Sequence, residues 1–250
     1  MYQTVRGLVV RVTEYKDRDS LLTLLTRELG RITVKARNVR RRNSPLTVAC
    51  QLLALSEFTL FEYKDSYVVN DAHVVELFQG LRQDVKKLAL ATYFSQVASL
   101  ISMEDTPSPE LQPLVLNCLY GLSELDIPQN KVKSVFELRC ACLAGFMPDL
   151  TGCHACGDQT PDYFDVSEGR LECYNCRAFA ESGIRMPLSE GMLNAMRYIC
   201  SCDQKKIFSF TLSDSAMDSL SCITEAFLAT QLERGFSSLD LYKSFCIDIT

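Results

Sequence analysis

The first 75 residues alternate apolar and polar positions over short runs, as β-strands with one buried face do. Runs rich in valine and leucine cover residues 5–15 and 20–37, and the second run is interrupted near Gly30. Two further runs follow between residues 49 and 77, on either side of a polar turn. About five short strands in this length predict a small antiparallel barrel, for which the OB fold is the commonest five-stranded candidate.

From about residue 76 the apolar residues recur every three or four positions, which is the spacing of one helix face. Helices are predicted within residues 76–104, 107–125, 130–146, 189–202 and 213–235. The pattern therefore predicts an α+β protein, with an N-terminal five-stranded OB-like β-barrel at residues 1–76 and a C-terminal helical domain at residues 77–250. A cysteine-rich module at residues 150–180 interrupts the helical domain.

This cysteine-rich module is the most specific feature of the chain. It contains Cys153-x2-Cys156 and, after sixteen further residues, Cys173-x2-Cys176. Each pair can direct two thiolates into one small space, and two pairs complete a tetrahedral site for one Zn²⁺ ion per chain. A hairpin turning at Glu168–Gly169 would bring the pairs together. Because four thiolates fill the coordination shell, the predicted zinc is structural and not catalytic.

A thioredoxin-like redox role for one pair is an alternative, but it needs a single pair in a βαβ setting and leaves the second pair unexplained. His154 lies inside the first pair and is expected to face solvent. The remaining cysteines fall singly or as C-x-C within apolar or helical segments, where a reduced cysteine acts as a small hydrophobic residue. They are Cys50, Cys118, Cys140, Cys142, Cys200, Cys202, Cys222 and Cys246.

Few residues of the chain suit catalysis, so the protein is predicted not to be an enzyme. It has two histidines and lacks the H-x-x-x-H, H-x-E, G-x-S-x-G and Walker patterns. A hydrolytic metalloenzyme would require that one of the four cysteines is not a ligand. No charged leader with an apolar core and no apolar run of 18 residues occurs, which predicts a cytoplasmic protein without a membrane span.

Charge is divided unevenly along the chain. Residues 1–50 contain 11 Lys and Arg against 4 Asp and Glu, a net charge of +7, although the whole chain carries −5. The other 200 residues therefore carry −12. An anionic ligand responds to the local electrostatic field and not to the average charge of the chain. The basic head, residues 1–50, therefore indicates an anionic partner.

The strongest basic segment is GRITVKARNVRRRNSPL, residues 30–46. If RITVKAR is a strand, its apolar residues enter the barrel and its cations share the opposite face, about 6.6 Å apart for every two residues. Such a face, with the arginine-rich loop after it, can neutralise successive phosphates of a nucleic acid. The predicted DNA-binding residues are Arg31, Lys35, Arg37, Arg40, Arg41 and Arg42. A solvated basic loop and a docking patch for an acidic protein are the alternatives.

Several of these segments together resemble the RecO family of bacterial recombination mediators. The resemblance rests on the basic head, on FELRCACLAGFMPDLTGCHACG, on GRLECYNC and on the terminal ERGFSSLDLYKSF. It spans nearly the whole chain, and its cysteine segments are specific whereas its barrel is generic. The family resemblance implies an OB domain, a helical domain and an embedded four-cysteine zinc module.

The resemblance also implies partners. Members of the family bind single- and double-stranded DNA, anneal complementary strands, and act with RecR to help RecA replace the single-stranded DNA-binding protein SSB. They bind the acidic, apolar-ended SSB tail, for which basic residues beside an apolar groove of the helical domain are suited. The candidates here are Lys131, Lys133 and Arg139. Some relatives lack the zinc cysteines, which favours a structural metal.

Two function classes follow from the sequence. The first is a non-enzymatic DNA-repair mediator associated with the bacterial nucleoid. The second is a zinc-stabilised interaction scaffold whose basic head docks an acidic protein. The salt dependence of oligonucleotide binding distinguishes them, because counterion release scales with the number of phosphates neutralised.

Overall fold

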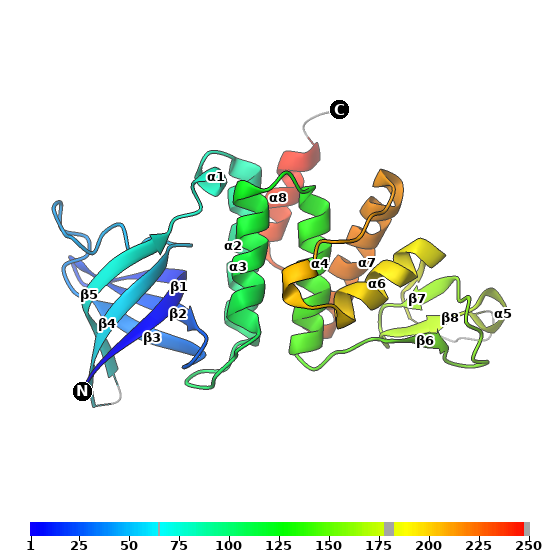
Figure 1. Cartoon of the computed structure of the whole chain (residues 1–250), viewed down its shortest axis with the longest axis horizontal. Coiled ribbons are helices and arrows are strands. Elements are labelled where there is room, and N and C mark those ends of the chain that lie inside the picture. Colours follow the sequence, from blue (N-terminus) through cyan, green and yellow to red (C-terminus); the bar gives the residue numbers. More distant parts are fainter. Residues whose placement is uncertain (65, 178–182, 248–250) are drawn as a thin grey trace. The chain divides into compact units, whose positions relative to one another are not determined.

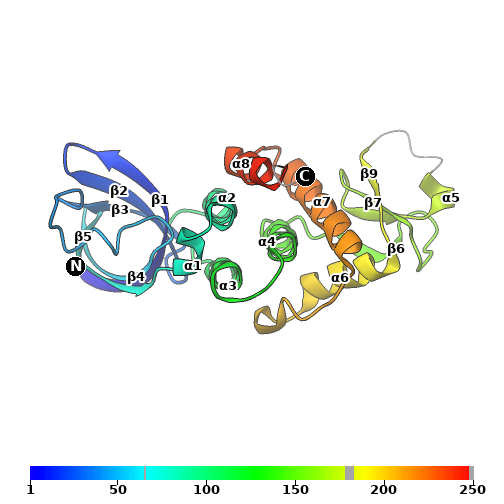
Figure 2. The ribbon, with the colours of Figure 1, turned by 90° about the horizontal axis from the view of Figure 1, so that it is seen from above.

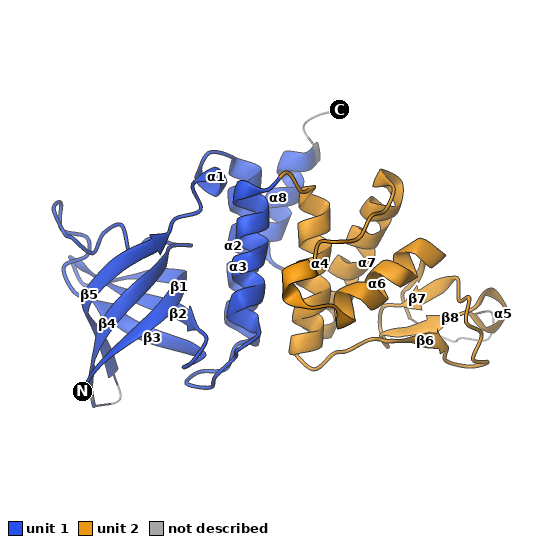
Figure 3. Cartoon of the chain, in the orientation of Figure 1, with its two compact units in different colours: residues 1–125, 236–250 blue, residues 126–235 orange. Residues whose placement is uncertain are grey.

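We describe the fold from a computed structural model, which covers residues 1–64, 66–177 and 183–247 (Figure 1). The chain divides into two compact units, one formed by residues 1–125 and 236–250 and the other by residues 126–235 (Figure 3). The first unit thus contains helices as well as the barrel. The domain boundary predicted at residue 76 stays a prediction.

A closed five-stranded barrel forms the N-terminal part of the first unit, and the predicted OB-like fold is confirmed. The strands follow the order β1-β2-β3-β5-β4, in which β3 and β5 pair in parallel and the other neighbours pair antiparallel. Their bounds are β1 Tyr2–Tyr15, β2 Asp19–Thr26, β3 Arg31–Ala36, β4 Leu55–Tyr63 and β5 Ser66–Glu76. A register shift between Val9 and Arg11 bends the long strand β1, which pairs with both β2 and β4.

The alternation predicted for the basic strand is present in β3. Ile32, Val34 and Ala36 are fully buried in the barrel core, whereas Thr33 is exposed and Arg31 and Lys35 are half-buried. A strand of period two places these two sets on opposite faces. The position of the basic side chains follows from this register.

Four helices complete the first unit, namely α1 Gln79–Arg82, α2 Val85–Ile101, α3 Leu111–Glu124 and α8 Ser237–Ile247. Helix α2 packs against strand β1 and also against α8, which comes from the far end of the chain (Figure 2). The rings of Tyr93 and Phe236 meet edge to face at 5.3 Å, and Ser238 donates a hydrogen bond to Gln96 at 2.7 Å. The sequence pattern did not predict α8.

Gln112 joins α3 to the barrel. Its side-chain amide is buried and donates to the carbonyl of Arg6 at 3.0 Å and to that of Leu25 at 2.8 Å. These acceptors lie in β1 and β2, so one side chain connects the helix to two strands. A buried side-chain amide contributes to stability mainly because its loss leaves the acceptors without a donor.

Gln112→Leu is therefore expected to destabilise the first unit by about 1–3 kcal/mol, the usual cost of unpaired buried polar groups. Thermal unfolding followed by circular dichroism measures the effect. The matched variant Gln112→Glu should cost more, because its carboxylate brings only acceptors to the two carbonyls. Unchanged unfolding of both variants would contradict this role.

The second unit contains three longer helices, α4 Gln129–Leu143, α6 Glu190–Ser201 and α7 Asp214–Gln231, and a 3₁₀ turn at Gln204–Lys206. Serine side chains cap the last two of these helices, since Ser189 accepts from the N–H of Met192 and Ser213 from that of Ala216. A small sheet of order β6-β8-β7-β9 lies between α4 and α6 in sequence. It comprises β6 Asp149–Cys153, β7 Tyr163–Asp165, β8 Arg170–Glu172 and β9 Arg185–Pro187, with the one-turn helix α5 Tyr174–Arg177.

Among the described residues, no helix has the length and apolar character needed to cross a membrane. The predicted residues 178–180 of the cysteine-rich module lie outside the described part of the chain.

Candidate metal centre and nucleic-acid interface

The four cysteines of the two C-x2-C pairs meet in space. The sulfur atoms of Cys153, Cys156, Cys173 and Cys176 all lie within 4.8 Å of one another, so this cluster can hold a metal ion. Two of these atoms, the Sγ of Cys156 and the Sγ of Cys173, are 3.7 Å apart. A tetrahedral ion with bonds of about 2.3 Å to sulfur has edges of about 3.8 Å. The spacing of the thiols thus fits tetrahedral coordination.

Local structure explains how the cluster forms. Cys153 ends β6, and the chain turns back through Gly157, whose φ of 77° is left-handed and suits glycine. The hairpin between β7 and β8 turns at Gly169, as predicted, with a φ of 65°. Cys173 directly follows β8, and Cys176 lies in α5. The two pairs therefore come together because β6 and β8 are neighbours in the sheet.

Backbone amides prepare the cluster for a cation. Burial would raise the pKa of the Cys153 thiol, but N–H groups of Cys156, Cys173 and Ala155 outweigh it and lower the pKa to about 6. The neighbouring thiols Cys173 and Cys156 raise the pKa of Cys176 to about 12. Four thiolates this close repel one another, and a metal ion removes that repulsion. His154 is exposed and lies outside the cluster, as expected.

Arg31, the first of the predicted DNA-binding residues, faces a helix of its own unit. Its guanidinium donates to the carbonyl of Ser99 in α2 at 2.7 Å. The backbone of Arg31 also exchanges hydrogen bonds with the segment after α2, from its N–H to Met103 at 3.2 Å and from the N–H of Asp105 to its carbonyl at 3.1 Å. Arg31 therefore joins β3 to the helices.

Two other predicted cations have acidic partners. The Lys35 ammonium lies 3.4 Å from the Asp19 carboxylate and 4.8 Å from the centre of the Tyr15 ring. The backbone N–H of Asn38 and the charge of Lys35 lower the pKa of Asp19. Arg40 pairs with Glu14 at 3.0 Å. The two pairs partly neutralise the positive charge of β3 and of the loop that follows it.

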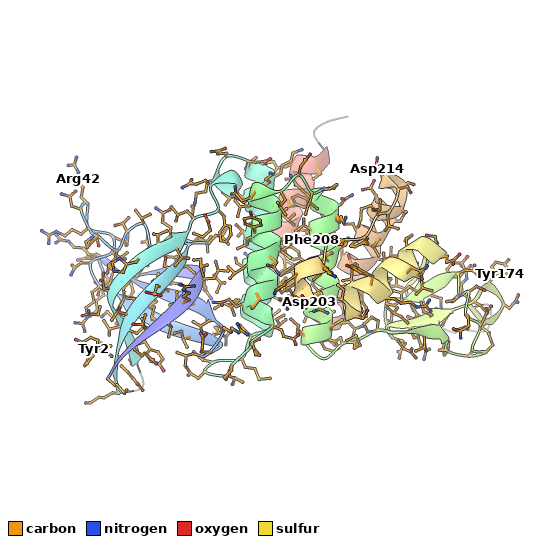
Figure 4. The ribbon with its side chains drawn as sticks, in the orientation of Figure 1. Tyr2, Arg42, Tyr174, Asp203, Phe208 and Asp214 are labelled. Carbon is orange, nitrogen blue, oxygen red and sulfur yellow. The ribbon has the colours of Figure 1, made fainter. Side chains whose placement is uncertain are left out.

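The remaining predicted cations, Arg37, Arg41 and Arg42, are exposed and form no ion pair with any described residue. Figure 4 shows Arg42 pointing away from the barrel at the tip of the loop after β3. Two apolar side chains anchor this loop to the barrel, because Val39 and Leu46 are buried in the barrel core. The threonine hydroxyl of the same loop, Thr47, donates to the carbonyl of Val39 at 2.8 Å.

Two hollows adjoin the basic residues within the first unit. One, of about 330 Å³, lies on the arginine loop itself and is lined by Asn38, Arg41, Arg42, Asn43, Ser44 and Pro45. The other, of about 380 Å³, combines two aromatic side chains and a cation with two acids from the segment after α2. Its lining is Tyr15, Leu21, Thr33, Lys35, Ser66, Tyr67, Val68, Glu104 and Asp105. The sequence did not predict that Glu104 and Asp105 approach this face.

The three candidates for the SSB tail are placed differently from one another. Lys131 is partly exposed, and its ammonium donates to the Phe210 carbonyl at 2.6 Å and lies 4.6 Å from the centre of the Phe210 ring. Lys133 is only 3% exposed. Arg139 donates to the carbonyls of Cys200 and Ile199 at the end of α6, at 2.9 and 3.4 Å. Lys131 and Arg139 are thus both partly exposed, whereas Lys133 is buried.

Lys133 belongs to a buried ionic cluster between α4 and α7. Its ammonium lies 3.1 Å from Glu137, which is fully buried, and 2.9 Å from Glu225. Burial alone would lower the pKa of Lys133, but the two carboxylates outweigh it and raise the pKa. Thr224 donates to the Glu137 carboxylate at 2.8 Å. This lysine is a structural residue of the interior.

Comparison with known proteins agrees with these features. Two family models match, Recombination protein O N terminal over residues 1–78 and Recombination protein O C terminal over residues 82–240. The chain is 31% identical over 245 residues to the DNA repair protein RecO of Acetivibrio thermocellus, covering 97% of each chain. It is 28% identical over 240 residues to that of Alkaliphilus metalliredigens, covering 95% of this chain and 97% of the relative. The chain therefore belongs to the RecO family of DNA repair proteins.

Proposed function

We propose that this protein is a non-enzymatic mediator of recombination in the bacterial cytoplasm. It binds single- and double-stranded DNA, promotes annealing of complementary strands and, with RecR, helps to load RecA on DNA covered by SSB. The observation that carries the proposal is an arginine-rich loop on an OB-like barrel, in which Arg37, Arg41 and Arg42 have no ion pair with a described residue, in a chain of the RecO family. Barrels of this class commonly bind oligonucleotides through their strands and loops.

The DNA interface of this proposal centres on the loop after β3. Arg37, Arg41 and Arg42 are free to neutralise phosphates, and Arg40 can exchange Glu14 for a phosphate at little cost, because an exposed ion pair contributes little. Lys35 is a secondary contact beside Tyr15. Arg31 acts through its hydrogen bond to α2 as a positioning residue.

The metal of this proposal is one structural Zn²⁺ per chain. Four thiolates at tetrahedral spacing are the donor set that zinc prefers, and they leave no open position for a substrate. Cys153, Cys156, Cys173 and Cys176 would hold the ion, whose charge would keep all four thiols deprotonated. The residues of this chain then contribute to DNA repair by binding and not by catalysis.

The SSB tail is proposed to bind near Lys131. This residue lies beside the Phe210 ring on the segment that follows α6, where Figure 4 labels Asp203 and Phe208. An ammonium beside an aromatic ring suits a peptide that ends in carboxylates and an apolar side chain. Lys133 is not proposed as a contact, because its ammonium is buried between two carboxylates. Arg139 is not proposed either, because among the described residues only Lys131 of the three candidates lies over an aromatic ring.

Replacing Arg40, Arg41 and Arg42 together by alanine is expected to weaken binding of single-stranded DNA and to flatten its salt dependence. With about 0.7 counterions released per phosphate, three lost contacts lower the slope of log K against log salt by about 2. Fluorescence anisotropy of a labelled oligonucleotide, titrated at several salt concentrations, measures both quantities.

The control is the double variant Arg11→Ala/Arg27→Ala, which removes exposed charges from the same barrel outside the loop. The arginine loop follows Ala36, which pairs with Ser20 at the start of β2. Arg27 follows the other end of β2, after Thr26. The control should keep the slope of the unchanged protein. Equal slopes for all three proteins would contradict the proposed interface, and absence of binding even at low salt would favour docking of an acidic protein.

A further inference from the structure

Cys142 and Cys200 lie side by side, although 58 residues separate them in the chain. Cys142 is in the last turn of α4 and Cys200 in the last turn of α6, and their Sγ atoms are 3.7 Å apart. Both side chains are partly exposed, in contrast to the fully buried thiols of Cys118 and Cys140. This pair is separate from the four cysteines of the metal centre. Solvent can therefore reach two adjacent thiols.

A guanidinium stands beside the pair. Arg139, one helical turn before Cys142, donates to the Cys200 carbonyl at 2.9 Å, and its Nε is buried without a hydrogen-bond acceptor among the described residues. The hydrogen bond between the two sulfurs lowers the pKa of Cys142, and the charge of Arg139 acts in the same direction. The same sulfur contact raises the pKa of Cys200. The pair therefore favours the state in which Cys142 is a thiolate and Cys200 keeps its proton.

We propose that Cys142 and Cys200 form a redox pair, which closes to a reversible intramolecular disulfide when a hydroperoxide oxidises it. The proposal rests on the sulfur contact and on the fixed guanidinium beside it. A thiolate next to a cation and open to solvent is the form of cysteine that peroxides oxidise, and a second thiol within contact resolves the product.

The chemistry balances with hydrogen peroxide as the oxidant. The Cys142 thiolate attacks one peroxide oxygen and the O–O bond breaks, which leaves a sulfenic acid on Cys142 and a hydroxide that takes up a proton. The Cys200 sulfur then attacks the Cys142 sulfur, and the departing hydroxide leaves as water with the Cys200 proton. Two thiols and one peroxide yield one disulfide and two waters. A small thiol reverses the reaction by disulfide exchange.

Closure needs only a short movement, because sulfurs already in contact must approach to about 2.05 Å. Its position gives the disulfide a structural consequence. Helix α4 precedes β6, where the first metal ligand lies, and α6 follows β9. The disulfide would therefore join the two chain segments that enter and leave the small sheet of the metal centre.

The test uses the full-length, metal-loaded protein and one equivalent of hydrogen peroxide at pH 7. After free thiols are blocked with N-ethylmaleimide, chymotryptic peptides are examined by mass spectrometry, since cleavage after Leu143 and Phe146 separates Cys142 from the metal ligands. We expect a peptide pair linked through Cys142 and Cys200, two hydrogens lighter than its parts and separated by dithiothreitol. Before oxidation, iodoacetamide should react faster with Cys142 than with the exposed Cys222, because the Arg139 guanidinium favours the thiolate of Cys142.

Matched variants decide the assignment. Cys142→Ser and Cys200→Ser should each abolish the linked peptide, whereas Cys222→Ser should retain it. Arg139→Gln should slow the alkylation of Cys142 several-fold and should leave that of Cys222 unchanged. The proposal is overturned if the pair remains open to alkylation after peroxide treatment, if disulfides form first among the metal ligands, or if oxidation instead links separate chains through Cys222 or Cys246.

Discussion

Cys173→Ser is expected to abolish binding of the metal ion and to unfold the two loops that carry the ligands. The Cys173 side chain is buried in the cluster, and its backbone N–H donates to the Cys153 sulfur at 3.3 Å. A serine hydroxyl stays protonated near neutral pH and does not replace a thiolate ligand. The ion binds a preformed cluster only in the folded state, so its binding free energy, about 10–16 kcal/mol for zinc in small zinc domains, is also folding free energy.

The apolar core of the small sheet is small. Among the described residues from β6 to β9, the fully buried apolar side chains include Phe164, Val166 and Leu171, and a chain of this length seldom folds by burial alone. Phe164 of β7 packs edge to face on Phe227 of α7 at 5.3 Å. We therefore expect β7 to retain more amide protection than the ligand loops.

Metal content and hydrogen exchange measure the two parts of this prediction. The variant should bind less than about a tenth of an equivalent of zinc under a chelator that leaves the unchanged protein loaded, because one ligand of four is lost. Peptides around Cys153–Gly157 and Cys173–Cys176 should exchange rapidly. Cys222→Ser, which changes an exposed thiol of α7 outside the cluster, is the control. Full metal content in Cys173→Ser would show that this thiol is not a ligand.

Lys133→Met is expected to cost about 3–5 kcal/mol, the usual penalty for breaking a buried ion pair from one side. The variant removes the cation from Glu137, which is fully buried, and from Glu225, and leaves a carboxylate without charge compensation between α4 and α7. Burial already raises the pKa of Glu137. Without Lys133 this carboxyl should take up a proton, which limits the loss but does not remove it.

Native-state hydrogen exchange of α4 and α7 measures the effect, because the two units of the chain need not unfold together. Protection of the most stable amides should fall by about two to four orders of magnitude, the equivalent of that free energy. Lys205→Met, at an exposed lysine of the same unit, should leave it unchanged. The double variant Lys133→Met/Glu137→Met should recover most of the loss, since apolar pairs replace buried ion pairs well. Normal protection in Lys133→Met would refute the structural role of this lysine.

The cysteine assignments show how far sequence reasoning reaches. The spacing of the two C-x2-C pairs predicted the cluster, because the turn inside each pair and the hairpin between them are local. The interpretation of the remaining cysteines as small hydrophobic residues holds for the buried Cys50, Cys118 and Cys140. Cys142, Cys200 and Cys202 are partly exposed, and Cys222 and Cys246 are exposed. Helical spacing alone does not show which edge of a helix stays open to solvent.

The basic residues likewise show what a sequence pattern predicts and what it does not. Alternation along β3 correctly predicted which side chains enter the barrel and which do not. It did not predict that Arg31 would bond to a carbonyl 68 residues away or that Lys35 would pair with Asp19. Only the structure shows which cations already have partners and which do not. The predicted DNA-binding cations that have no such partner among the described residues lie in the loop after β3.

The sequence by itself determined the barrel, most of the helices and the four-cysteine cluster, because each depends on periodicity or on spacing within a few tens of residues. It also determined the family, through segments along nearly the whole chain. Only the tertiary structure decided that α8 returns to pack on α2, that Lys133 is an interior residue, and that Cys142 meets Cys200. The physical reason is that a side chain carries its charge and donors in the sequence, whereas its partners depend on which distant segments pack against it.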